Sequence, residues 1–134
     1  MTEKIRSIVA SQVTVEIIPE REIHAVRGNA LASGDDALDK QVEDEIIDAD
    51  NQGNEWAWCT VEVRVRFIVD GKERTGSDYL GCVSHIHSKE KGFRNRGGYL
   101  PSMIEGALNN ALIPDCVMSP RERTKLVKRE VVNG

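Results

Sequence analysis

The segment Glu55–Val69, EWAWCTVEVRVRFIV, alternates between two sets of side chains along its whole length. Successive side chains of a β-strand point to opposite faces, so this pattern predicts one long strand. One face is apolar and must meet a core; it consists of Ala57, Cys59, Val61, Val63, Val65, Phe67 and Val69. The other face carries two tryptophans and two arginines; it consists of Trp56, Trp58, Thr60, Glu62, Arg64, Arg66 and Ile68.

Shorter alternating segments precede this strand. In Val13–Ile17, apolar residues alternate with Thr14 and Glu16, which predicts a strand that ends at Pro19. Ile23–Arg27 predicts a second short strand after a turn. The sequence therefore predicts two strands before the first helix.

A hairpin is expected directly after the long strand. Asp70-Gly71 is a strong signal for a tight turn, because both positions tolerate positive φ. The return strand is expected over Glu73–His85, where Gly76 and Gly81 favour bulges.

Two segments have helical periodicity. The first runs from Asp35 to about Ala49, with Ser33 as the expected N-cap and an apolar stripe of Leu38, Val42, Ile46 and Ala49. The second begins at Pro101 and ends before Pro114, with an apolar stripe of Met103, Ile104, Ala107, Leu108, Ala111 and Leu112. His87–Gly98 between the strands and this helix is expected to be a basic loop.

These elements predict an α+β fold. An antiparallel sheet of about four strands, in the order ββ-α-ββ-α, would be covered on one face by two helices. Residues 1–118 would form a single domain, and residues 119–134 a polar, basic C-terminal tail.

The net charge of −4 is unevenly distributed along the 134 residues. Residues 1–58 hold 13 acidic and 5 basic side chains, a charge of −8, and residues 59–134 hold 9 and 13, a charge of +4. Such a split marks a candidate partner surface. Three widely spaced cysteines argue against a disulfide framework and predict the cytoplasm of a host cell. Neither a membrane partner nor a cofactor is expected.

The predicted first helix carries carboxylates every three or four residues. Together with an apolar anchor, these residues are the candidate partner-binding site: Asp36, Asp39, Glu43, Asp44, Asp48, Trp56 and Trp58. Carboxylates at this spacing can imitate a nucleic-acid backbone and occupy a basic groove. Buried aromatic anchors often supply much of the energy of an interface.

Two alternatives remain open. A nucleic-acid-binding module would use the sheet face and the basic loop, through Arg64, Arg66, Lys89, Lys91, Arg94 and Arg96. A metal-dependent or Cys/His enzyme would use Cys82, His85 and His87, but a tetrahedral zinc site would need a fourth ligand such as His24 or Cys59. No assembled catalytic motif is present, so the protein is expected not to be an enzyme.

Four stretches carry a resemblance to known sequences: VRGNALASGDDALDKQVEDEII from Val26, GNEWAWCTVEV from Gly53, GSDYLG from Gly76 and GGYLPSMIEGALNNAL from Gly97. In these stretches the chain resembles small uncharacterised accessory proteins of bacteriophages, prophages and plasmids. The resemblance implies the gene of a mobile element and carries no catalytic residue with it. Small acidic α+β proteins of such elements are often inhibitors of host defence, anti-CRISPR proteins among them.

The expected function is therefore that of a non-enzymatic binding protein or inhibitor. Its partner would be a protein or ribonucleoprotein complex of the host, and the acidic helix would occupy a surface of that complex. A long strand with a polar and aromatic second face also favours a homodimer.

Overall fold

The computed structural model describes residues 4–31, 33–95 and 97–131. Their elements, in chain order, are β1 Arg6–Ser7, the short 3-10 helix η1 Ala10–Gln12, β2 Thr14–Arg21, α1 Asp36–Asn51, β3 Cys59–Val69, β4 Lys72–Val83, α2 Lys89–Phe93, α3 Leu100–Leu112, β5 Cys116–Val117 and α4 Pro120–Glu130. Among these described residues, none of the helices has both the length and the apolar character that a membrane span requires.

The fold class is α+β, as the sequence predicts. The main sheet is antiparallel and has three strands in the order β2-β3-β4, while β1 and β5 form a separate parallel pair. The long alternating segment thus supplies the central strand. The predicted order ββ-α-ββ-α and the predicted four-stranded sheet are not what the described residues form.

The chain is divided into two compact units. Unit 1 comprises Met1–Ile17, Val63–Asp78 and Arg94–Gly134, and unit 2 comprises Ile18–Glu62 and Tyr79–Phe93. Each of the three strands of the main sheet contributes residues to both units.

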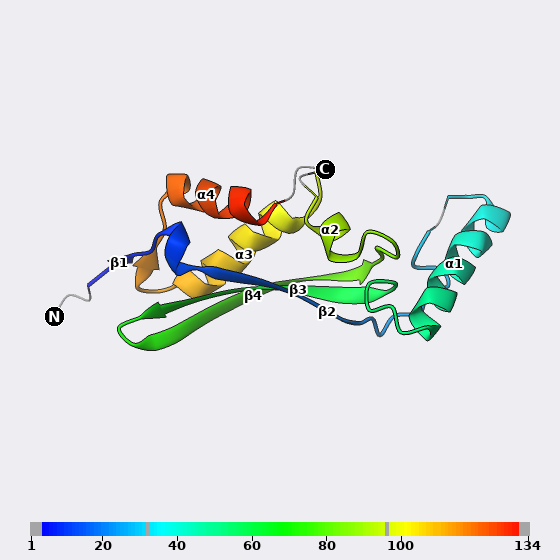
Figure 1. Cartoon of the computed structure of the whole chain (residues 1–134), viewed down its shortest axis with the longest axis horizontal. Helices are drawn as coiled ribbons and strands as arrows, with labels where there is room; N and C mark the ends of the chain where they lie inside the picture. The colour runs from blue at the N-terminus through cyan, green and yellow to red at the C-terminus, as the bar shows by residue number, and fades with distance from the viewer. Residues whose placement is uncertain (1–3, 32, 96, 132–134) are drawn as a thin grey trace. The chain divides into compact units, whose positions relative to one another are not determined.

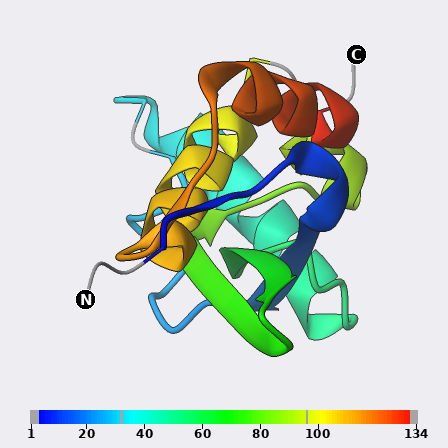
Figure 2. The same cartoon turned by 90° about the vertical axis from the view of Figure 1, so that its left-hand side faces the viewer.

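In unit 1, helix α3 packs closely on strand β4. All six residues of its predicted apolar stripe are buried, which confirms that helix. Gly76 makes the close approach possible, because a Cβ atom at this position would lie 2.2 Å from the carbonyl oxygen of Ala107. Figures 1 and 2 show α3 and α4 on the same side of the strands in this unit.

Helix α4 occupies most of the segment that was expected to be a polar tail. Only Leu126 of this helix is buried, so one apolar residue supplies its main contact with the core. Polar contacts supply the rest: Arg129 donates to the carbonyl oxygens of Ala10 and Val13 at 3.0 and 2.7 Å. Glu122 accepts a hydrogen bond from the Ala10 amide at 3.0 Å. Because α4 has one buried apolar residue and therefore no apolar stripe, hydrophobic periodicity does not predict this helix.

Arginine side chains satisfy the carbonyl groups at the ends of the unit 1 helices. Arg74 donates to the carbonyl oxygens of Ala111 and Ile113 at 2.9 and 2.7 Å, at the C-terminal end of α3. Arg94 donates to the carbonyl oxygen of Glu130 at 2.9 Å, at the end of α4. These guanidinium groups complement the unpaired carbonyls and negative dipole of each helix end.

In unit 2, the two tryptophans are core residues. Trp58 packs with Val26 and Ile46, and its indole N–H donates to the carbonyl oxygen of His24 at 2.7 Å. Trp56 packs in a second cluster with the rings of His85 and Phe93. The strand therefore begins at Cys59 rather than Glu55, and the segment before it forms a turn.

Two further predictions in unit 2 are wrong. Strand β2 continues through Pro19 to Arg21, because β2 lies at an edge of the sheet, where the missing proline N–H breaks no ladder bond. Ile23–Arg27 is not a strand: Ile23 is 92% exposed, and the His24 amide donates to the carboxylate of Glu22 at 3.0 Å. His87–Gly98 also contains the short helix α2.

The hairpin between β3 and β4 is confirmed. Asp70 and Gly71 have φ values of 52° and 77°, as a tight turn with two left-handed positions requires. On the sheet face that is opposite to α3, Arg66 of β3 bridges Glu16 of β2 at 3.0 Å and Glu73 of β4 at 3.6 Å. At the edge strand β4, the side-chain amide of Asn110 donates to the carbonyl oxygen of Ser77 at 2.9 Å.

We predict that Gly76→Ala destabilises the protein by about 1–3 kcal/mol, because its methyl group would force α3 away from β4. Urea unfolding followed by tryptophan fluorescence measures this change. Gly97→Ala is the control, because a Cβ atom there would have only the side-chain oxygen of Asn95 nearby, at 3.9 Å. Equal stability of the two variants would contradict the packing described.

Candidate protein-binding surface on helix α1

Helix α1 begins at a capped N-terminus. Asp35 is the N-cap, and its carboxylate accepts hydrogen bonds from the amides of Ala37 and Leu38, both at 3.1 Å. The expected N-cap, Ser33, lies two residues earlier and donates from its hydroxyl to Asp39 at 2.6 Å. A carboxylate at the N-cap accepts hydrogen bonds from the free amides, and its negative charge interacts favourably with the positive end of the helix dipole.

One side of α1 is buried in unit 2. Ile46 packs with Val26 and Trp58, and Val42 and Ile47 lie at the edge of this cluster. The buried side chain of Glu43 accepts a hydrogen bond from the Gly28 amide at 2.7 Å. The helix is therefore fixed by an apolar cluster and by a carboxylate that holds the preceding loop.

Arg27 joins the same loop to the helix. Its guanidinium forms ion pairs with Asp44 and, at 3.3 Å, with Glu43. The hydrogen bonds to Asp44 and Glu43 raise the pKa of Arg27, since they stabilise its charged form. Two of the five predicted helix carboxylates are thus partly neutralised within the unit.

The exposed face of α1 follows a different register from the predicted row. Leu38, Gln41, Glu45 and Asp48 recur at steps of three and four residues, so they lie on one side of the helix, and all four are exposed. Asp36 is exposed near the N-terminus. The pattern of acids alone did not distinguish the carboxylates that face solvent from Asp39 and Glu43, which hold the loop.

Trp56 or Trp58 could act as the predicted aromatic anchor only if exposed, and neither is exposed. Trp56 and Trp58 are 6% and 3% exposed, so neither can enter a pocket on a partner. The sequence placed them on a sheet face, whereas the structure places both in a turn in which Trp56, Ala57 and Trp58 are buried. Leu38, which is 45% exposed, is the large apolar side chain that the acidic face presents instead.

Glu22 holds the beginning of the loop that connects β2 to α1. Burial opposes ionisation of this carboxyl, but hydrogen bonds from the backbone of His24, Cys82 and Ile23 and from the Thr60 hydroxyl outweigh it and lower its pKa to about 2. The Cys82 amide is 2.7 Å from its Oε1 atom. Glu22 thereby links the end of β2 to strands β3 and β4.

The nucleic-acid candidates are distributed over both units. Arg66 is paired with Glu16 and Glu73, Arg94 bonds the end of α4, and Arg64 is half-buried. Lys89 and Lys91 are exposed but belong to unit 2, whereas the arginines belong to unit 1. Arg96 lies outside the described residues.

The metal and thiol candidates are engaged separately. Cys82 donates its amide to Glu22, His85 packs on Trp56 and Phe93, and His87 lies 3.3 Å from Glu45. No group of three metal-capable side chains is found among the described residues. Burial raises the pKa of Cys59 to about 11, and burial also raises the pKa of Cys82, so neither thiol is activated as a nucleophile.

We predict that Glu43→Ala lowers the free energy of unfolding by about 2 kcal/mol, because the Gly28 amide and the Arg27 guanidinium lose an acceptor. Asp48→Ala on the exposed face should change it by less than about 0.5 kcal/mol. Urea unfolding of the two variants tests the assignment of one carboxylate to structure and the other to surface. A larger loss for Asp48→Ala would refute it.

We predict that Glu22 makes the protein sensitive to acid. A carboxyl with a folded pKa of about 2 and an ordinary value of 4.5 stabilises the fold above pH 4.5, and this contribution disappears as the pH falls toward 2. The urea midpoint of the wild type should therefore decrease over this range. Glu22→Gln should be less stable at pH 7 and lose part of the slope, whereas the exposed control Glu20→Gln should keep it.

The chain was compared with known proteins at three levels. No family model, no characterised protein and no solved structure matches it. Function must therefore be inferred from the geometry and charge of the surfaces that the chain itself presents.

Proposed function

We propose that this protein is a non-enzymatic binding protein whose helix α1 occupies a basic surface on a larger macromolecular complex. The exposed face of α1 would make the contact through Glu45 and Asp48. Leu38 would supply an apolar contact within the acidic face. The separation of charge between the two units is the observation that carries this proposal.

The charge asymmetry of the sequence is retained in the folded units. Unit 2 contains 13 acidic and 5 basic residues, a charge of −8, and unit 1 contains 9 and 13, a charge of +4. Each unit combines segments from distant parts of the chain, so this outcome was not assured by the difference between the halves of the sequence. Helix α1 contributes eight of the 13 acids of the acidic unit, if its N-cap is included.

The carboxylates of α1 are divided between two roles: some bond the preceding loop, and others face solvent, where they could contact a partner. Glu43 and Asp39 bond the preceding loop, whereas Asp48 forms no ion pair among the described residues. Glu45 has His87 as its partner at 3.3 Å, and both side chains are largely exposed, so water competes with this pair. A rigid helix with solvated carboxylates needs little reorganisation before it binds a cationic surface.

A basic surface that ordinarily holds nucleic acid is the partner that fits this face best. Carboxylates on successive helical turns are about 5–6 Å apart, which approximates the spacing of charges along a nucleic-acid backbone. The resemblance to phage and plasmid accessory proteins supports a defence or regulatory complex of the host as that partner. An inhibitor that blocks a nucleic-acid groove needs no catalytic group.

The test compares two double variants that remove the same charge. In Glu45→Gln/Asp48→Asn the face of α1 is neutralised, and in Glu20→Gln/Glu55→Gln two exposed acids elsewhere in unit 2 are neutralised. Immobilised wild type is expected to capture a host complex from bacterial extract at about 50 mM salt and to release it as salt increases. The α1 variant should retain it at least about tenfold less, and the control should retain it.

Two results would count against the proposal. Undiminished capture by Glu45→Gln/Asp48→Asn would exclude the α1 face as the contact. Equal losses from both double variants would show that net charge, and not this helix, governs retention. Circular dichroism of each variant verifies that α1 remains folded.

A further inference from the structure

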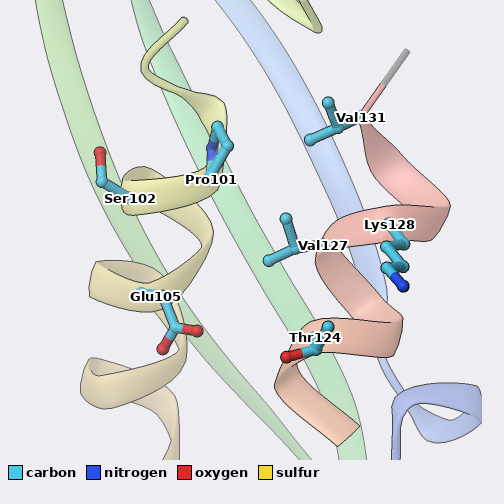
Figure 3. Close-up of a pocket in the computed structure, with 7 residues that line it drawn as sticks. All are labelled: Pro101, Ser102, Glu105, Thr124, Val127, Lys128 and Val131. Carbon is cyan, nitrogen blue, oxygen red and sulfur yellow. The ribbon is translucent and has the colours of Figure 1, made fainter. Parts of the chain in front are cut away.

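A groove of about 800 Å³ lies between α3 and α4. Figure 3 shows Pro101 and Glu105 on α3 facing Val127 and Val131 at the α4 side, with Val127 directed toward α3. Pro101, Val127 and Val131 are half-buried, so the groove contains an apolar part that is incompletely covered. Such a seat between two helices suits one apolar side chain of a third helix.

Exposed bases lie along α4, one of them, Lys128, in the lining of the groove. Arg121 and Lys128 are exposed on α4 and lie seven residues apart, on the same side of the helix. Figure 3 shows the amine of Lys128 farther from α3 than Val127 is. The acid at the rim, Glu105, is paired with Arg123 at 2.5 Å. An occupant with an apolar residue and acids beside it would complement this surface.

Helix α1 of a second molecule carries that combination. Its exposed face begins with Leu38 and continues with Glu45 and Asp48, which lie seven and ten residues further along. We propose that the groove between α3 and α4 of one molecule receives α1 of a second molecule. Leu38 would lie near Val131, and the two acids would lie near the bases of α4.

The spacing along the two helices supports this match. In α1, Asp48 is ten residues from Leu38, and Arg121 in α4 is ten residues from Val131, the C-cap of that helix. At a rise of about 1.5 Å per residue, each interval spans about 15 Å. With Leu38 seated near Val131, an antiparallel arrangement places Asp48 beside Arg121 and sets the helix dipoles in opposite directions.

This association goes beyond the proposed function and uses the same face of α1. Self-association would therefore compete with binding of a basic partner, and the partner would release the second molecule. If each of two molecules binds α1 of the other, a closed dimer forms. If each molecule binds α1 of the next, a longer oligomer forms. Either form depends on the same contact.

Charge reversal on both sides tests the contact. The groove variant is Arg121→Glu/Lys128→Glu, and the helix variant is Glu45→Lys/Asp48→Lys. Sedimentation velocity at about 50 mM salt should show wild-type association between 1 and about 200 µM, weakened at least about tenfold in either variant. An equimolar mixture of the two variants should associate again, because the reversed charges are then complementary.

The outcomes separate cleanly. A wild type that remains monomeric throughout this range overturns the proposal, as does undiminished association of either variant. A mixture that fails to associate, when each variant alone is folded by circular dichroism, also overturns it. Glu20→Lys/Glu55→Lys is the control and should associate as the wild type does. Since capture of a host complex is measured separately, failure here leaves the proposed function intact.

Discussion

The central strand β3 is the constraint on which the rest of the structure depends. Cys59, Val61, Val63 and Val65 have no exposed surface, so the face of the strand that carries them must be covered. Helix α3 provides part of that cover in unit 1, and Gly76 allows it to approach within backbone contact of β4. Since buried apolar area is the main favourable contribution to folding, loss of this contact would remove the basis for every surface described.

Much of the fold follows from patterns that are local in the sequence. Alternation identified the strand, Asp70-Gly71 identified the hairpin, and the stripes identified α1 and α3. Two features depended on distant partners and were not predictable. Helix α4 has one buried apolar residue, Leu126, and is otherwise attached by hydrogen bonds to residues more than a hundred positions away. The turn before β3 continues the same alternation, yet both Trp56 and Trp58 point inward.

The sequence predicted that the candidate site is an acidic helix, but it did not predict which carboxylates of that helix face solvent. The sequence identified an acidic helix correctly, because carboxylates are frequent on one side of its apolar stripe. It could not show that Glu43 would be buried, because that depends on the Gly28 amide, fifteen residues earlier. Charged residues in this protein often serve backbone groups: Arg74 and Arg94 satisfy helix ends, and Glu22 satisfies three amides. Counting charges therefore overestimates the number that can meet a partner.

The contact between Asn110 and Ser77 has a consequence for how the protein behaves when it is crowded. Within the described part of the chain, strand β4 pairs with β3 on one side only, so its other edge could recruit a strand from a neighbouring chain. The amide of Asn110 already takes one of the carbonyl oxygens that such a strand would need. A side chain from a helix thus interrupts the template, which protects a long, valine-rich hairpin from growing into aggregated sheets.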